Sequence, residues 1–288
     1  MQVEAFAKIN WSLDITGVRE DGYHLMDMLM QPISLSDEIR LSPAPDLQLS
    51  TDGFPRVRAD RNNLAYRAAD ALRQRTGYTG GASIHVFKRI PVGAGLGGGS
   101  ADAAGVLRGL NLLWKLGLTN AELEEIGLTL GADVPFCLRG GLTRTRGIGE
   151  EMENLPVTMN YRLVVVQPCR GLSTGEVFKA WKAGPAGDRP DTDAAAEALE
   201  TGDPERLCRA VGNVLQPVSV QFRPEIGSAI DALTQAGAIR ALMTGSGSAV
   251  FGIFRSGKDA QEAAAVCAKR WRSVFLCHTQ SDSIRIEE

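Results

Sequence analysis

Hydrophobic positions in the first half of the chain follow two different periods. Some stretches alternate apolar and polar residues, which is the period of a strand with one face on a core. These stretches are residues 3–16, 33–49 (an antiparallel hairpin), 82–90 and 140–152 (a weaker strand pair). Apolar residues three and four apart predict helices over 63–75 and 101–114, and from Thr119 to near Leu130. Asn62 and Thr119 are the candidate N-caps.

The second half mixes strands and helices in the same way. Strands are predicted over 161–167, in 241–254 after a small-residue turn, and over 273–278; helices are predicted over 193–200, 204–215, 224–236 and 258–270. Residues 183–191 are rich in glycine and proline, and we expect them to be disordered. The pattern restarts near residues 153–156, so we predict two domains, 1–154 and 155–288. Because hairpins occur alongside helices, the expected fold class is α+β rather than a doubly wound sheet.

Composition narrows the class of protein. The chain has 288 residues and a net charge of −3, without the basic block that nucleic-acid binding would need. It shows no signal core, no transit character and no apolar run of membrane-spanning length, so we expect a cytoplasmic protein with no membrane partner. The five cysteines are scattered and never form C-x-x-C, which indicates reduced thiols and argues against structural zinc. No pattern points to a particular oligomeric state.

A glycine-rich loop is the strongest chemical signal in the chain. Five glycines lie between Gly93 and Gly99, after the strand predicted over 82–90 and before the helix predicted over 101–114. Glycine allows positive φ and close approach of a ligand, and a helix N-terminus offers unpaired N–H groups and a partial positive charge. This arrangement predicts a phosphate-binding loop.

Other kinds of glycine loop fit less well. A mobile linker would not be flanked by a strand and a helix. Gly93, Gly95 and Gly98 match G-x-G-x-x-G, but a dinucleotide site needs an acidic residue after a second strand, roughly 20 residues on. The acidic residues at that distance lie at the start of a predicted helix: Glu122, Glu124 and Glu125. The P-loop pattern G-x-x-x-x-G-K-[ST] does not occur, so a third arrangement is expected.

Charged residues in apolar surroundings are the candidate catalytic groups. Lys8, Asn10 and Phe6 are expected on one face of a strand, with Ile9 on the other. Lys8 needs a partner or a wet cleft, unless it is an edge-strand residue that reaches solvent. Asp133 is either an N-cap or Asx-turn residue or a general base. Beside a phosphate cradle, a carboxylate and an ammonium group could deprotonate a hydroxyl and stabilise a transferring phosphoryl group.

Three motifs together resemble the GHMP superfamily, the small-molecule kinases that phosphorylate galactose, homoserine, mevalonate and phosphomevalonate. They are Lys8–Asn10, the glycine loop 91–100 and residues 244–248. Within it, residues 7–10, 21–24 and 131–136 and the Gly-Gly-Gly-Ser end of the loop are similar to the family of 4-diphosphocytidyl-2-C-methyl-D-erythritol kinases. The resemblance spans nearly the whole chain and implies a two-domain α+β fold with the active site in the interdomain cleft.

The resemblance also implies a reaction. An enzyme of this kind transfers the γ-phosphoryl group of ATP to the 2-hydroxyl of cytidylated methylerythritol, in the non-mevalonate pathway to isoprenoids. Asp133 would accept the substrate proton, Lys8 would keep Asp133 ionised, and Asn10 would orient the reacting group. No acidic residue stands out as a Mg²⁺ ligand, so ATP and water are expected to hold the ion.

Binding residues follow from the same resemblance. Tyr23 and Phe178 match cytosine-stacking positions, and His24 would read the edge of the base; on pattern alone, Tyr23 and His24 could equally be solvated loop residues and Phe178 an ordinary helix residue. Thr174 and Lys179 align with the same substrate segment. Asn63 lies where the family contacts adenine. The residues expected at the ATP phosphates are Pro91, Val92, Gly93, Ala94, Gly95, Leu96, Gly97, Gly98, Gly99, Ser100 and Ala101. Many relatives carry a second serine at the position of Ala101, which leaves Ser100 as the hydroxyl there.

Three alternatives stay open at this point. A sister kinase for homoserine or a mevalonate derivative would not need a stacking pair such as Tyr23 and Phe178. A non-catalytic nucleotide-binding relative would not need both Lys8 and Asp133. A nicotinamide-dependent redox enzyme matches the glycine loop least well.

Overall fold

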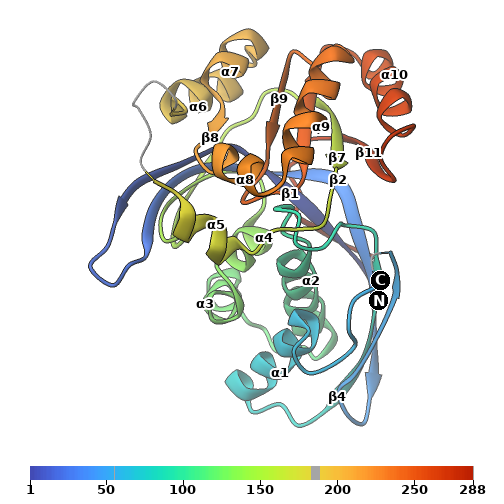
Figure 1. Cartoon of the computed structure of the whole chain (residues 1–288). Coiled ribbons are helices and arrows are strands. Elements are labelled where there is room, and N and C mark those ends of the chain that lie inside the picture. The colour runs from blue at the N-terminus through green and yellow to red at the C-terminus, as the bar shows by residue number, and fades with distance from the viewer. Residues whose placement is uncertain (55, 183–188, 288) are drawn as a thin grey trace.

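A computed structural model describes residues 1–54, 56–182 and 189–287 of the chain. In this part of the chain the strands form two sheets, and helices pack on both of them (Figure 1). The strands of the first sheet are β1 (Gln2–Val18), β2 (His24–Ala44), β3 (Gln48–Gly53), β4 (Gly81–Lys88), β5 (Leu142–Gly147), β6 (Glu151–Leu155), β8 (Gly212–Asn213) and β12 (Ile284–Glu287). Those of the second are β7 (Arg162–Gln167), β9 (Arg240–Met243), β10 (Val250–Phe254) and β11 (Ser273–His278). This mixture confirms the α+β prediction.

The helices also fall into an earlier and a later group along the chain. The helices of the first part are α1 (Leu64–Thr76), α2 (Gly98–Leu113), α3 (Asn120–Leu130) and α4 (Val134–Arg139). The later ones are α5 (Thr174–Ala180), α6 (Thr192–Thr201), α7 (Pro204–Ala210), α8 (Gln216–Phe222), α9 (Pro224–Gln235) and α10 (Gly257–Cys267). α2 packs on β1 and β2, whereas α9 and α10 pack on the second sheet. The capping box of Thr119 with Glu122 confirms the predicted start of α3.

The pairing of one predicted pair of strands differs in the structure. The hairpin expected over 33–49 is wrong, because β2 is one long strand that pairs on one side with β1 and on the other with β4. Because β2 is hydrogen-bonded to other strands on both sides, it cannot pair with β3. β3 instead pairs with β4 in parallel, and α1 lies in the connection between these two strands. The result is a sheet of order β12-β1-β2-β4-β3, with β5 also on β2 and β8 on β1.

Several element ends also differ. Asn63 rather than Asn62 caps α1, because its side chain accepts a hydrogen bond from the Ala65 N–H at 2.9 Å. The helix expected over 204–215 ends at Ala210, and the residues after it pair with β1 as β8. The disordered stretch predicted over 183–191 lies largely outside the described residues, since 183–188 are not described.

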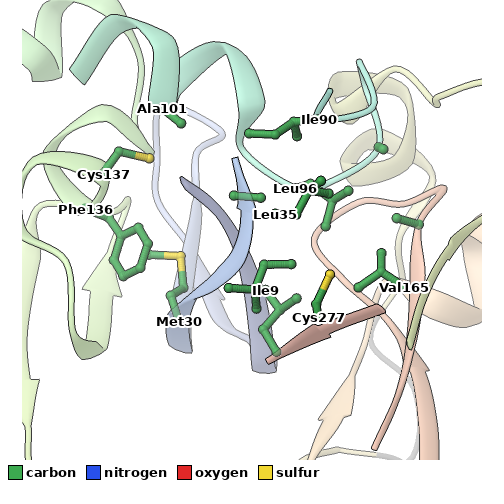
Figure 2. Packing of buried hydrophobic residues seen from close by; sticks show 14 of the residues in the cluster. Ile9, Met30, Leu35, Ile90, Leu96, Ala101, Phe136, Cys137, Val165 and Cys277 are labelled. Carbon is green, nitrogen blue, oxygen red and sulfur yellow. The ribbon is translucent and has the colours of Figure 1, made fainter. Parts of the chain in front are cut away.

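Two glycines allow α2 to approach the first sheet closely. A Cβ at Gly105 would lie 2.8 Å from Cδ1 of Ile39, and one at Gly109 would lie 2.3 Å from Cδ1 of Leu41. Both contacts are shorter than van der Waals packing permits, so larger residues would push α2 away from the strands. Figure 2 shows part of the core, with Ile90 and Leu96 of the glycine-loop segment in the same cluster as Ile9 of β1 and Ala101 of α2. The core thus fixes α2, and with it the position of the glycine loop.

Candidate active site

The glycine loop runs from the end of β4 to the start of α2 and lines a cavity of about 770 Å³. Gly93, Gly95 and Gly97 have φ values of +63°, +79° and +70°, in the left-handed region that favours glycine. Gly97 directly precedes α2, whose first N–H groups have no partner within the helix. The loop and the α2 N-terminus therefore have the geometry of an anion site.

The loop also contacts the turn between β9 and β10. A Cβ at Gly95 would lie 2.2 Å from the carbonyl oxygen of Thr244, so only glycine fits there. The Ala249 N–H donates to the Ala94 carbonyl at 3.0 Å. The Thr244 hydroxyl also accepts a hydrogen bond from the Asn10 N–H at 3.0 Å. The three motifs noted in the sequence thus meet at one place, between the two sheets.

Lys8 and Asn10 form the floor of the cavity next to the loop. The Lys8 ammonium donates to Oδ1 of Asn10 at 2.7 Å and lies 3.6 Å from Oδ2 of Asp133. Lys8 is only 4% exposed, so the alternative of an edge-strand lysine in solvent is wrong. A Cβ at Gly97 would lie 3.1 Å from Cγ of Lys8, which places the lysine stem directly beneath the phosphate loop.

Phe6 does not share this face, contrary to expectation. The register of β1 against β2 shifts between Phe6 and Lys8. A step of two residues on β1 is matched there by a step of four on β2, and such an irregularity interrupts the regular alternation of side chains. Phe6 accordingly packs beneath the guanidinium group of Arg285 from β12, 5.3 Å from its ring centre, while Lys8 faces the cavity.

Asp133 occupies the position before α4. Its backbone is in the N-cap position, but its side chain accepts no capping hydrogen bond from α4, whose residues are all described. The carboxylate is instead directed at Lys8, and its side chain is 37% exposed at the cavity. Of the two alternatives for this residue, the geometry favours the carboxylate that can reach a substrate.

An aromatic group lies where β2 begins. The His24 ring lies 5.2 Å from the Phe178 ring, at a tilt of 54°, and 5.8 Å from the Trp181 ring, at 82°. Phe178 lies in α5 and Trp181 directly follows the helix, and both rings contact His24. Trp181 was not singled out in the sequence, although its spacing from Phe178 is the signal that could have identified it. Tyr23 is 62% exposed at the tip of the β1–β2 hairpin.

The structure brings most of the predicted site residues to the cavity wall. Those that line it are Lys8, Asn10, Asn63, Pro91, Val92, Gly93, Ala94, Gly95, Gly97, Gly98, Gly99, Ser100, Asp133, Thr174 and Phe178. Among the described residues, the predicted ones outside the lining are Tyr23, His24, Leu96, Ala101 and Lys179. Leu96 and Ala101 are fully buried behind the loop. Thr174 is held by a 2.9 Å hydrogen bond with the Ser246 hydroxyl.

Some of the lining residues were missed in the sequence. Lys88 and Asp102 are buried polar residues at the base of the loop, and Asp37 contacts Lys88 from β2. Two of them could have been noticed in the sequence. Lys88 is a charged residue in the apolar strand predicted before the loop, and Asp102 is a charged residue at the start of the helix predicted after it. Gly245 and Ser246 belong to the motif noted at residues 244–248, although no site role was predicted for them. The other lining residues without a predicted site role are Leu13, Met26, Met28, Val57, Arg58, Asp60, Asn62, Leu64 and Ala132.

One buried carboxyl at the base of the loop has a pKa well above its ordinary value. Burial raises the pKa of the Asp102 carboxyl, Lys88 lowers it and Asp37 raises it, and the net result is a pKa of about 8. Over residues 1–54, 56–182 and 189–287, no three His, Cys, Asp or Glu side chains are grouped to hold a metal ion. In the same ranges, no helix is both long and apolar enough to cross a membrane.

Comparison with known proteins gives two family matches. The family model "GHMP kinases N terminal domain" matches residues 63–141, and "GHMP kinases C terminal" matches residues 195–273. The chain is 43% identical over 277 residues to a 4-diphosphocytidyl-2-C-methyl-D-erythritol kinase from Pelotomaculum thermopropionicum, covering 96% of each chain. It is 41% identical to the kinase of the same name from Moorella thermoacetica, covering 97% of this chain and 99% of the relative.

Solved structures give the same picture. A crystal structure of 4-(cytidine 5'-diphospho)-2C-methyl-D-erythritol kinase superposes with a TM-score of 0.83 at 35% identity, covering 98% of this chain and 100% of that chain. A homoserine kinase from Cytophaga hutchinsonii superposes with a TM-score of 0.79 at 18% identity, covering 100% of this chain and 97% of that chain. The second similarity concerns the fold alone.

Proposed function

The chain belongs to the 4-diphosphocytidyl-2-C-methyl-D-erythritol kinases of the GHMP family, and from this premise we propose how its residues carry out the reaction. It is an ATP-dependent kinase that phosphorylates the 2-hydroxyl of 4-diphosphocytidyl-2-C-methyl-D-erythritol, in the non-mevalonate pathway to isoprenoids. The observation that carries the proposal is the grouping of Lys8, Asn10 and Asp133 beside the glycine loop.

The glycine loop holds the ATP phosphates in this proposal. The left-handed glycines allow backbone N–H groups to approach the phosphate oxygens, and the α2 N-terminus adds a partial positive charge. Asn63 lies at the adenine end of the cavity, where its side chain is bonded to the backbone of Ala65 and Arg58 and so fixes the start of α1. The nucleotide is thus oriented with its γ-phosphate toward Lys8.

Asp133 accepts the proton of the substrate hydroxyl. Its carboxylate is the exposed member of the pair, whereas the buried Lys8 ammonium lies between it and the loop. Lys8 neutralises charge that develops on the transferring phosphoryl group, and Asn10 fixes Lys8 through their 2.7 Å hydrogen bond. Proton acceptance and electrostatic stabilisation therefore come from adjacent groups.

A magnesium ion accompanies ATP in this proposal. Ser100 and Asp133 line the cavity with oxygen atoms, the donor type that Mg²⁺ prefers, but they do not form a cage. The ion is therefore carried by the phosphates and water. When bound, it neutralises charge on the phosphoryl group, while the chain supplies the loop, Lys8 and Asp133.

The cytidine end of the substrate binds between α5 and the β1–β2 hairpin. Phe178 offers its ring at the cavity wall, His24 packs against that ring, and the exposed Tyr23 lies next to His24 at the hairpin tip. Aromatic stacking of a base contributes about 1–3 kcal/mol. Thr174 and Lys179 complete this end from α5.

We place the enzyme in the cytoplasm, where cysteines remain reduced.

The test is ADP release with Mg²⁺-ATP and three alcohols supplied separately: the cytidylated methylerythritol, homoserine and mevalonate. We expect release with the cytidylated substrate alone. Release with homoserine or mevalonate instead would keep the roles of Lys8 and Asp133 and reject the cytidine site. No release with any alcohol, together with retained ATP binding, would favour a non-catalytic nucleotide-binding protein.

A further inference from the structure

A buried ion cluster closes the base of the glycine loop. Lys88, the last residue of β4, is 2% exposed, and its ammonium donates to Oδ2 of Asp102 at 2.6 Å. The same ammonium donates to Oδ2 of Asp37, which is fully buried in β2. One lysine thus links a strand of the sheet to Asp102, the fifth residue of α2.

The cluster holds both ends of the loop. Oδ1 of Asp37 accepts hydrogen bonds from the N–H groups of Arg89 at 2.6 Å and Ile90 at 2.9 Å, the residues that lead into the loop. Asp102 follows the loop directly, two residues after Ser100. A Cβ at Gly98 would lie 3.5 Å from the Lys88 ammonium, so this charge lies immediately behind the α2 N-terminus.

The charges of the cluster do not balance. Two carboxylates face one ammonium, and Oδ1 of Asp102 has no hydrogen-bond partner among the described residues. The charged and titratable groups around this carboxyl are Lys88 of β4, Asp37 of β2 and the thiol of Cys137 in α4. A buried carboxyl of this kind is neutral when it carries a proton and adds a negative charge behind the phosphate site when it loses it.

We infer that Lys88, Asp37 and Asp102 are positioning residues that fix the glycine loop for ATP, and that Asp102 couples ATP binding to one proton. A segment with so many glycines loses much conformational entropy when it is ordered, so it needs anchors at both ends. The cluster supplies them from groups that are almost entirely buried. The inference rests on the proposed function, because it concerns the same nucleotide site.

The first test separates positioning from general stability. In Lys88→Met the ammonium is lost and both loop ends are released, and we expect the KM for ATP to rise about tenfold to a hundredfold, since small misplacements of bound groups are costly. The KM for the alcohol should not change. Backbone amides of residues 92–100 should exchange faster with solvent. Lys258→Met, at a lysine whose side chain is 83% exposed, is the matched control.

The second test uses pH and stands even if Lys88→Met fails to fold. Binding of a non-hydrolysable Mg²⁺-ATP analogue is measured by calorimetry from pH 7 to pH 9. The wild-type Kd should rise about tenfold across this range, because ionised Asp102 repels the phosphates and one proton is linked to binding. Asp102→Asn still accepts a hydrogen bond from Lys88 but cannot ionise, so its Kd should stay constant.

The outcomes are distinguishable. A wild-type protein that binds no analogue at any pH would contradict the proposed function itself. Analogue binding with the same pH dependence in wild type and Asp102→Asn would reject the proton coupling. A folded Lys88→Met protein with a lower melting temperature but an unchanged KM for ATP would make the cluster a structural one and overturn the positioning role.

Discussion

The reacting groups differ in how far the protein encloses them. Lys8 is buried and bonded to Asn10, whereas the side chain of Asp133 is partly exposed at the cavity. A proton acceptor must touch the substrate hydroxyl, so it has to be accessible. A charge that only has to act on the phosphoryl group works best when water is excluded, because a low local dielectric strengthens its field. The asymmetry of the pair therefore suits the two roles proposed for it.

Replacing the carboxylate tests this assignment. In Asp133→Asn the proton acceptor is lost while the size of the side chain is retained, and we expect kcat to fall about 10²- to 10⁴-fold. Binding of ATP should persist, because the glycine loop and Lys8 remain. Turnover by steady-state ADP release and nucleotide affinity by calorimetry measure the two effects. Asp282→Asn, at an exposed aspartate, is the control, and undiminished turnover in Asp133→Asn would remove this residue from the mechanism.

At the scale of elements, features that depend on neighbours in sequence could be predicted. The β4–loop–α2 unit, the Thr119 cap and the type of most elements follow from local patterns. Pairing between distant segments could not be predicted, because periodicity shows which face of a strand is apolar but not which strand lies next to it. For this reason the β2–β4 pairing, the β12 strand and the Lys88 cluster were not predicted.

Gly95 offers a prediction at this scale, since it joins the loop to the turn before β10. In Gly95→Ala the added Cβ would overlap the Thr244 carbonyl at 2.2 Å, and the backbone has a φ of +79°. We expect the loop to move and ATP affinity to fall by more than about tenfold, since anion binding depends on aligned N–H groups. Calorimetry with the ATP analogue measures the change.

Gly77→Ala is the matched control for backbone strain. Gly77 has a similar φ of +70° at the end of α1, but a Cβ there would meet nothing within 4 Å. This variant should lose about 1 kcal/mol of stability and keep its nucleotide affinity. Equal affinities in the two variants would show that contact with Thr244 does not position the loop.

At the scale of the whole molecule, β1 connects the two sheets. Strands β8 and β12, which come late in the chain, both pair with β1. Trp11 of β1 packs edge-on against Tyr161 at 5.2 Å and Phe251 at 5.7 Å, at the second sheet. Asn10, one residue earlier, is bonded to Thr244 of the β9–β10 turn. The cavity therefore lies where the sheets are held together rather than at a loose junction.

This connection predicts a single unfolding transition. If the sheets unfolded separately, a nucleotide would stabilise only the part that binds it. Because β1 belongs to the first sheet and packs against the second, ligand binding should stabilise the whole chain. At a hundred times Kd, Mg²⁺-ATP should add about 2.7 kcal/mol to the free energy of unfolding. For a chain of this size, that corresponds to a rise of about 4–5 °C in melting temperature. Differential scanning calorimetry with and without nucleotide measures it, and two transitions of which only one shifts would show that the sheets are independent units.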